Sequence, residues 1–369
     1  MNSTLPKWAD ILLIPLLSLI LAFLVSGLVV LFIGKDPIEA VQVMLFGEFG
    51  EYGALAKYGI GHTLYYTTSF IFTGLAVAVA FHARMFNIGG EGQALLGGVG
   101  VTLVLLSFDW PHWTIAIVAA IISAMIFSAA WAAIPAYLQA KRGSHIVITT
   151  IMFNLIASAL INFLLIGPMQ APNRPNESPG FPDGAAIPNL HDFFAIFGVE
   201  FDKHAPANIS LFLALISAVL VWYLIWKTRL GYEIRAYGHS EDAAVYAGIS
   251  PVKITMIAML ISGALAGMMA INTVQGEAER LILDPVEGAG FIGIAVALMG
   301  RSHPVGVVLA AFLFGVLYAG GGELQSAMQI PREMIVVIQG LIIMFVGSLE
   351  NIVRIPVERL FLRVRKRNL

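Results

Sequence analysis

The 369-residue sequence contains no cysteine and few charged residues. Without cysteine the chain can form no disulfide, no zinc–thiolate site and no cysteine nucleophile. Only 12% of its residues are Asp, Glu, Lys or Arg, whereas 58% are hydrophobic, and the charged share is about half that of a typical globular domain. Because so few charged residues cannot cover a water-exposed surface, we expect the chain to lie in a lipid bilayer. The net charge of −2 gives no information about a nucleic-acid partner, and we expect none.

Patterns for catalysis or nucleotide binding are also missing. The stretch "GGEGQALLGG" carries Leu95 where a dinucleotide fingerprint needs its third glycine. The stretch "IGKD" lacks the upstream glycine and the hydroxyl residue of a phosphate loop. The eight histidines show no paired metal-ligand spacing. The chain is therefore predicted not to be an enzyme, with no catalytic residue, metal site or cofactor of its own.

Hydrophobic runs occupy most of the chain, and each is a candidate transmembrane helix. They cover residues 11–33, 59–81, 93–107, 113–138, 146–166, 209–225, 254–271, 288–299, 305–318 and 334–346. The first is long enough to span about 30 Å of hydrocarbon and lacks a signal-peptide cleavage site, so we interpret it as a retained helix. The sequence predicts an all-α polytopic membrane protein of about ten transmembrane helices, in one domain over residues 1–369.

Two of these runs are short, and each follows glycine-rich polar sequence. "NIGGEG" precedes run 93–107, and "DPVEGAG" precedes run 288–299. Paired, glycine-interrupted spans are typical of transporters with internal repeats and broken helices near the membrane midplane. Residues 82–92 could either reach the cytoplasm or re-enter the membrane.

The distribution of Lys and Arg predicts the orientation. With the N-terminus inside, 15 of the 21 basic residues face the cytoplasm, as the positive-inside rule requires. Both termini are then cytoplasmic. The outer side carries a loop at 168–207 with seven prolines, which should form an extended cap. The short apolar stripe within 36–57 is expected to lie along the outer interface.

Segment 229–252 is the most informative cytoplasmic stretch. Ser240 is a good helix N-cap, Glu241 favours the first turn, and Gly248 suits the position after a helix end. These signals predict a short helix over 241–247, with Ser250 and Pro251 starting the next span. The helix is either part of an ordinary loop or a docking element, because "AAVYAGI" offers a small apolar knob to a partner's groove.

Three long motifs carry a family resemblance. "MFNIGGEGQALLGG", "GYEIRAYGHSEDAAVYAGI" and "EGAGFIGIAVALMGRSHPVGVVLAAFLFGVLYAGG" together resemble permease subunits of bacterial ABC importers in the branched-chain amino acid and simple-sugar permease family. The form "NIGGEGQ" resembles the nucleoside importers of that family. The resemblance runs from about residue 59 to 321.

The resemblance implies an ATP-driven importer in the bacterial inner membrane. Its expected partners are a second homologous permease, a cytoplasmic ATPase with two nucleotide-binding halves that binds ATP and Mg, and an extracytoplasmic substrate-binding lipoprotein. The family's coupling helix maps onto residues 235–249. The residues expected to couple to the ATPase are Arg235, Gly238, Glu241, Ala243, Ala244 and Gly248. Arg235 should anchor the segment to a carboxylate or a carbonyl, and Gly238 should form a turn.

The expected substrate path takes five residues, each with an alternative role. They are Asn87, Glu91, Gln93, Asn154 and Phe291. Glu91 either caps backbone N–H groups and holds the helix break open, or contacts substrate or a gate. The amides could match nucleobase edges or satisfy broken-helix backbone and neighbouring helices. Phe291 could stack on a base or pack in the core.

Two other functions stay open. One is a simple-sugar permease of the same fold, and the other is an ion-coupled secondary transporter, which also uses broken helices. The docking helix argues against the second, because an ion-coupled carrier needs no ATPase contact. The sequence does not predict which nucleoside or sugar is carried.

Overall fold

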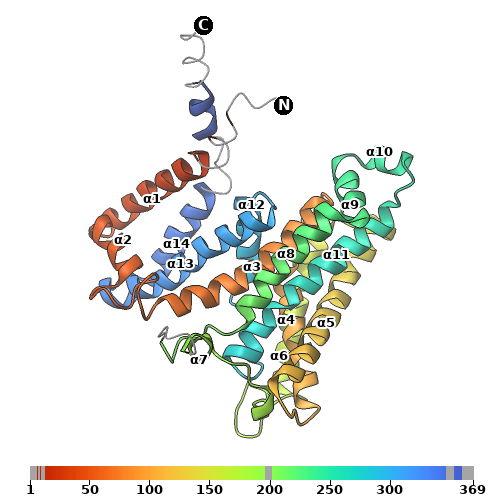
Figure 1. Cartoon of the computed structure of the whole chain (residues 1–369), viewed down its shortest axis with the longest axis horizontal. Helices are drawn as coiled ribbons and strands as arrows, with labels where there is room; N and C mark the ends of the chain where they lie inside the picture. The colour runs from red at the N-terminus through yellow and green to blue at the C-terminus, as the bar shows by residue number, and fades with distance from the viewer. Residues whose placement is uncertain (1–5, 7–8, 10–12, 196–201, 346–352, 360–369) are drawn as a thin grey trace. The chain divides into compact units, whose positions relative to one another are not determined.

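The computed structural model describes residues 6, 9, 13–195, 202–345 and 353–359, and these residues are overwhelmingly helical (Figure 1). Apart from two isolated bridges, the described residues form no β-structure. The predicted all-α class is confirmed. The chain divides into two compact units, residues 60–316 and residues 1–59 with 317–369.

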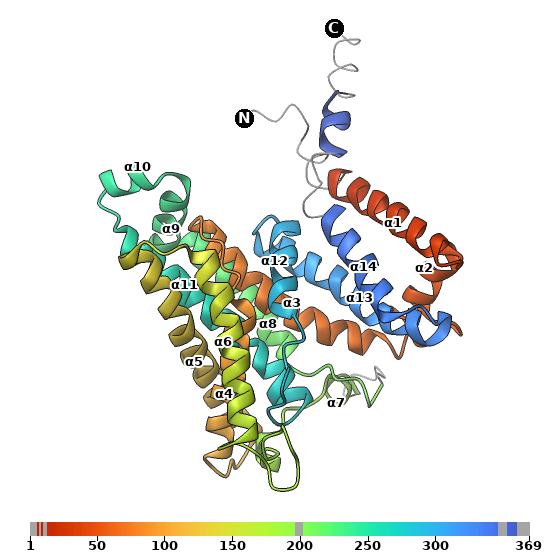
Figure 2. The same cartoon turned by 180° about the vertical axis from the view of Figure 1, so that it is seen from behind.

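The larger unit is a bundle of apolar helices. Its main members are α3 (Ile60–His82), α4 (Gly90–Leu106), α5 (Trp113–Arg142), α6 (Ile146–Ile166), α8 (Ser210–Lys227), α11 (Pro251–Gly267) and α12 (Ala289–Met299). Helix α11 packs on α5 and α3, α4 packs on α5, and α12 packs on α3 (Figures 1 and 2). α3 and α11 are buried over most of their apolar windows, whereas α5 and α6 expose much of theirs. Most of the exposed side chains of α5 and α6 are apolar, as lipid contact requires.

The number of membrane spans is smaller than the ten predicted. Among the described residues, six helices are long and apolar enough to cross a membrane, or up to seven if α1 and α2 count as one bent span. The prediction was wrong because α4, α12 and α14 (Arg332–Ile343) have only 17, 11 and 12 residues. An 11-residue helix rises about 17 Å, well short of about 30 Å of hydrocarbon.

Residues without helical structure precede both short helices, as predicted, and their place near the membrane midplane stays a prediction. Residues 83–89 separate α3 from α4 without helical structure. Helix α11 passes into a π-helix, η3 (Ile271–Glu277), and an irregular segment then leads to α12. Gly288 begins α12 with φ +78°, a conformation that suits glycine because it has no Cβ. Internal repeats stay a prediction.

The smaller unit contains α1 (Ile14–Phe32), α2 (Pro37–Phe46), α14 and the end of α13 (Pro304–Met328). Helices α1 and α2 meet at a bend of 111°. Asp36 starts α2, because its Oδ1 accepts a hydrogen bond of 2.8 Å from the Ile38 amide. The apolar stripe within 36–57 therefore forms a helix, and its place at the outer interface stays a prediction. Residues 1–5 and 360–369, at the two ends, lie outside the described residues.

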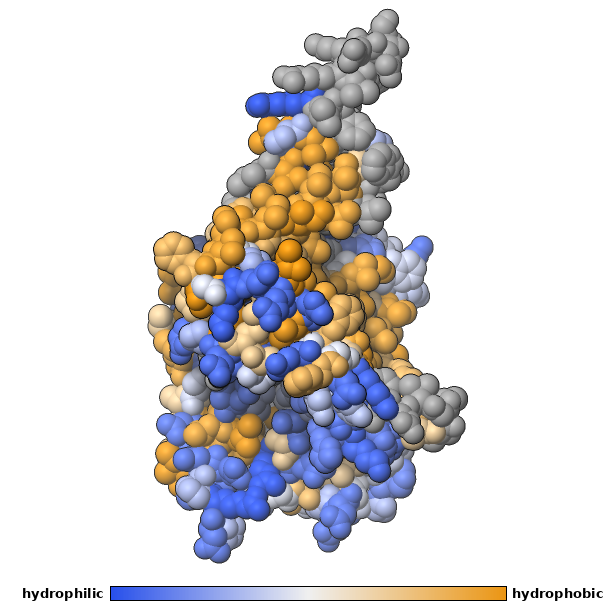
Figure 3. Space-filling view, turned by 90° about the vertical axis from the view of Figure 1, so that its left-hand side faces the viewer, coloured by the Kyte–Doolittle hydropathy of each residue, from blue (hydrophilic) through white to orange (hydrophobic). Residues whose placement is uncertain are grey.

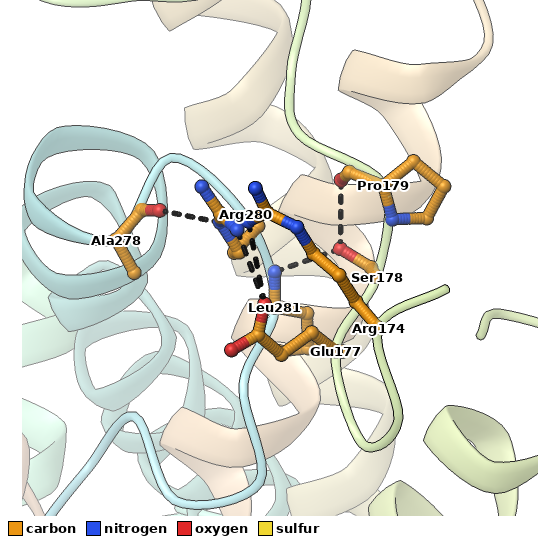
Figure 4. A network of polar contacts seen from close by, with 7 residues as sticks. All are labelled: Arg174, Glu177, Ser178, Pro179, Ala278, Arg280 and Leu281. Carbon is orange, nitrogen blue, oxygen red and sulfur yellow. Dashed lines mark hydrogen bonds and ion pairs between the residues drawn. The ribbon is translucent and has the colours of Figure 1, made fainter. Parts of the chain in front are cut away.

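The proline-rich loop is largely irregular over its described residues, as predicted, but it is fastened to the segment between η3 and α12 (Figure 4). Its short helical pieces are η2 (Asp183–Ala185) and α7 (Leu190–Ala195). The Ser178 amide donates to the Leu281 carbonyl at 3.0 Å, and the Leu281 amide donates to Ser178 Oγ at 2.9 Å. Arg280 adds an ion pair to Glu177 at 3.1 Å. The loop thus holds the segment that leads from η3 to α12.

Exposed apolar side chains match a lipid environment. Leu24 and Leu28 on α1 are each 64% exposed, and Leu155 on α6 is also 64% exposed. Figure 3 shows hydrophobic side chains gathered over a broad area of one face, separate from an area of hydrophilic ones. Such an apolar surface is unfavourable in water.

Candidate functional site

Four of the five predicted path residues are buried where the break between α3 and α4 meets α6, α11 and α12. Asn87 and Gln93 are 1% exposed, Asn154 is 5% exposed and Glu91 is 9% exposed. Buried polar groups need hydrogen-bond partners, because an unsatisfied one loses its hydration without compensation. Their partners therefore show what these side chains do in the fold.

Glu91 joins the two broken helices. Its Oε1 accepts a hydrogen bond of 3.0 Å from the Gly288 amide, and its Oε2 accepts one of 2.9 Å from the Gly290 amide. Both amides belong to the start of α12, where the helix dipole favours negative charge. Glu91 itself lies in the first turn of α4. One carboxylate thus serves the N-termini of both short helices.

Glycines allow the two helix starts to approach each other. A Cβ on Gly290 would collide with the Glu91 backbone, and a Cβ on Gly90 would lie 3.4 Å from the Gly290 carbonyl oxygen. Gly293 is equally close to Thr73 of α3. Gly290 and Gly293 thus allow close packing of α12 on α4 and α3. Gly288 differs, since its ideal Cβ meets nothing within 4 Å and its role is conformational.

Asn154 supports the other side of the break from α6. Its Oδ1 accepts a hydrogen bond of 2.9 Å from the Gly92 amide, and its Nδ2 donates one of 2.9 Å to the Ile88 carbonyl. It therefore satisfies one donor and one acceptor that the interrupted backbone leaves without helical partners. This is the interhelical role that the sequence offered as an alternative.

Asn87 and Gln93 pair with each other. Asn87 Nδ2 donates to Gln93 Oε1 at 3.0 Å and to Ser262 Oγ at 2.8 Å, while Asn87 Oδ1 accepts from the Gly89 amide at 2.9 Å. Ser262 in turn donates to the Ala76 carbonyl at 2.6 Å, and Ser128 donates to the Gln93 carbonyl at 2.6 Å. Sequence reasoning missed Ser128 and Ser262, whose only signal was a hydroxyl inside a hydrophobic run.

The five residues therefore fall into two groups. Asn87, Glu91, Gln93 and Asn154 form a buried hydrogen-bond network, which we call the break network. Phe291, in the first turn of α12, is 47% exposed and so is not a core residue of the described chain. A substrate contact by any of the five stays a prediction.

We expect Asn154→Ala to destabilise the protein and to leave its exposed surface unchanged, because Asn154 is buried. The substitution leaves the Gly92 amide and the Ile88 carbonyl buried without their partner, which should cost about 2 kcal/mol or more. The melting temperature of the purified protein measures the loss. Met152→Ala, at a 50% exposed position of the same helix, is the control and should change it little. Equal melting temperatures for the two variants would contradict the role of Asn154.

The predicted docking segment forms two helices, α9 (Arg229–His239) and α10 (Glu241–Tyr246). Ser240 Oγ accepts from the Ala243 amide at 3.3 Å, and Ser250 Oγ accepts from the Lys253 amide at 3.4 Å. Gly248 has φ +81°. The predicted helix over 241–247 and both caps are confirmed. Helix α9 was not predicted, because Gly231 and Gly238 inside it have low helix propensity.

Arg235 and Gly238 attach α9 to the bundle. Arg235 Nε donates to the Ile225 carbonyl of α8 at 3.1 Å, so the predicted anchor to a carbonyl is confirmed. Gly238 does not form a turn, which corrects the sequence interpretation. It lies inside α9, where a Cβ would collide with the His82 carbonyl oxygen at the end of α3. The glycine is needed for close packing.

Helix α10 has one residue packed against its own chain and an exposed apolar end. Ala244 is 2% exposed, whereas Val245 is 50% and Tyr246 is 96% exposed. Glu241, Ala243 and Gly248 are also exposed. A partner can therefore reach Val245 and Tyr246, which we call the α10 knob, while Ala244 holds α10 to its own chain.

Comparison with known proteins agrees with this arrangement. Residues 59–347 match the family described as branched-chain amino acid transport system / permease component. The chain is 34% identical to the guanosine ABC transporter permease protein NupP of Bacillus subtilis, over 91% of this chain and 93% of NupP. It is 32% identical to the nucleoside permease NupB of Lactococcus lactis, over 91% of this chain and 90% of NupB.

A permease named for glucose transport is similar to the same degree. The glucose ABC transporter permease protein TsgB13 of Haloferax volcanii is 32% identical over 91% of this chain and 87% of its own length. No solved structure matches the chain. The family match covers both breaks, the break network and the α10 knob. The chain is therefore a multi-pass membrane protein that belongs to the branched-chain amino acid transport system / permease component family.

Proposed function

We propose that the chain is a permease subunit of an ATP-driven importer of nucleosides. The observation that carries the proposal is the α10 knob, the exposed apolar part of a capped helix that packs against α9 and α11. Such an element suits a groove on a partner. Two of the three relatives named above are permeases for guanosine or nucleosides.

The knob would dock on a cytoplasmic partner that supplies energy. We propose a separate ATPase with two nucleotide-binding halves, which binds ATP and Mg, so that the permease needs no cofactor of its own. A second homologous permease would complete the translocation path, and an extracytoplasmic lipoprotein would deliver the substrate. The excess of basic residues in the expected cytoplasmic loops supports an inner-membrane orientation with both termini in the cytoplasm.

The two groups of path residues suggest a division of roles. The break network uses its hydrogen-bonding groups within the chain, so we assign it to holding the start of α4 and α12 in place. Phe291 is exposed beside this junction and is our candidate for stacking on a nucleobase, since every base offers a π-face. Glu91 would then act on the path indirectly, through the start of α12.

A simple-sugar importer is the second candidate. It is favoured by the similarity to TsgB13, whose identity is close to that of the nucleoside permeases. The family match argues against an ion-coupled carrier, because the relatives named above are permeases of ABC transporters.

Uptake by the reconstituted importer separates the candidates. The permease pair, ATPase and lipoprotein in proteoliposomes should accumulate radiolabelled guanosine or another nucleoside only when ATP and Mg are enclosed. Unlabelled nucleosides should compete, while glucose, ribose and leucine should not. Competition by glucose or ribose alone would transfer the assignment to the sugar candidate. Competition by leucine alone would overturn both.

A substitution in the α10 knob tests the ATPase contact. Tyr246→Asp should weaken co-purification of the ATPase, because a carboxylate cannot enter an apolar groove without losing its hydration. Folding of the permease should be unaffected, since Tyr246 is 96% exposed. Tyr232→Asp, at a 62% exposed position of α9, is the matched control. If both variants retain the ATPase equally, the knob is not the contact.

A further inference from the structure

An apolar groove runs along the larger unit between α8 and the start of α13. Its lining is Leu215, Ala218, Val219, Trp222, Pro304, Val305, Val308 and Leu309, and its volume is about 360 Å³. Val219, Val305 and Leu309 are 62%, 60% and 68% exposed. The groove is therefore open to whatever surrounds this unit.

One end of the groove is positively charged. Lys227, the last residue of α8, places its Nζ 5.4 Å from the centre of the Trp222 ring that lines the groove. Lys227 is exposed and forms no ion pair with a described residue. The neighbouring Trp226 ring lies 4.9 Å from the His303 ring, just before α13 begins. The end of α8 and the start of α13 thus lie side by side at this end of the groove.

The start of α13 adds to this positive end. Helix α13 has 25 residues and begins at Pro304, and the N-terminus of such a helix carries partial positive charge. Exposed Arg301 lies three residues before it. An ammonium beside a tryptophan at the end of an apolar helix is typical of the membrane–water interface.

A second groove of similar size provides a comparison. It is lined by Val104, Ala119, Ile122, Ser123, Ile126 and Phe127, with a volume of about 320 Å³. Neither groove has a basic residue in its lining. Lys227 nevertheless places its Nζ 5.4 Å from the ring of Trp222 in the first groove, whereas Lys141 on α5 lies 14 residues beyond Phe127 of the second groove, about 20 Å away along the helix. The first groove therefore has a cation at its end, and α5 supplies none close to the second.

We propose that the groove between α8 and α13 binds an anionic phospholipid, with an acyl chain in the slot and the phosphate at Lys227. The charge selects the headgroup, because a basic residue near the membrane surface attracts anionic lipid. The slot supplies the packing that an acyl chain does not find on a smooth helix face. The site is separate from the break network and from the α10 knob, and it does not depend on the substrate.

Native mass spectrometry of the purified complex with defined lipids tests the proposal. The wild-type complex should keep phosphatidylglycerol through detergent washing and release phosphatidylcholine. Lys227→Gln should lower phosphatidylglycerol occupancy about fivefold, since one such lysine contributes about 1 kcal/mol. Val219→Trp, which fills the slot and keeps the charge, should lower it as well.

Lys141→Gln is the matched control, because Lys141 is also an exposed basic residue in the last turn of a long helix. It should leave occupancy unchanged. Equal retention of the two lipids by the wild type, or equal losses in Lys227→Gln and Lys141→Gln, would overturn the proposal. A photo-crosslinker at Val219 that labels protein and not lipid would show that another polypeptide fills the groove, and would overturn it too.

Discussion

Glu91→Ala is expected to lower the thermal stability of the importer and its transport rate together. The substitution removes the acceptor of the Gly288 and Gly290 amides. Leaving two N–H groups without a partner in a buried place should cost about 2–6 kcal/mol. Helix α12 has only 11 residues, so loss of its N-terminal cap affects a large part of it. The melting temperature of the complex and transport per folded complex measure the two effects.

Two further variants sharpen this test. Glu91→Gln keeps one acceptor oxygen and should lie between wild type and Glu91→Ala in melting temperature. Glu279→Ala removes an exposed carboxylate from the segment that leads to α12 and should leave the melting temperature near that of the wild type. If Glu91→Ala abolishes transport at an unchanged melting temperature, the carboxylate acts on substrate or on a gate, and the capping role is contradicted.

Gly238→Val is expected to separate ATP hydrolysis from transport. Its side chain would meet the His82 carbonyl oxygen, a backbone atom that cannot rotate away. The His82 end of α3 leads directly into residues 83–89 and the break network, so displacing α9 there disturbs the connection between the α10 knob and the broken helices. We expect transport to fall about tenfold, within the usual range of coupling free energies, while the ATPase stays bound and hydrolyses ATP.

Gly143→Asn is the control for Gly238→Val. Gly143, just after α5, has φ +68° and nothing within 4 Å of its ideal Cβ, and asparagine tolerates the left-handed conformation better than other residues with a side chain. Transport should therefore stay close to wild type. Wild-type transport by Gly238→Val would show that the contact between α9 and α3 is not the link. Loss of ATPase binding by that variant would instead make α9 part of the docking surface.

Much of the local structure followed from neighbouring residues in the sequence. The caps at Ser240 and Ser250, the helix between them and the irregular stretch at 83–89 depend on groups within a few positions of one another. Ser240 reaches Ala243, three residues away, and a motif can predict a contact of that kind. The signals for α9 were equally local, but two glycines inside it suggested a loop. Packing against α8 and α3 outweighed their low helix propensity.

Composition and the long hydrophobic runs alone determined that the chain is an all-α membrane protein with two polar, glycine-rich interruptions, because bilayer burial requires long apolar helices and makes such interruptions stand out. Only the tertiary structure decided what the polar residues at the breaks do. Glu91 meets Gly288 across 197 positions, and Asn154 meets Gly92 across 62. From the sequence alone, it is known only that the carboxylate of Glu91 can accept hydrogen bonds. The amides that donate to it are decided by the packing of helices that are far apart in the chain. Here these amides belong to the start of α12.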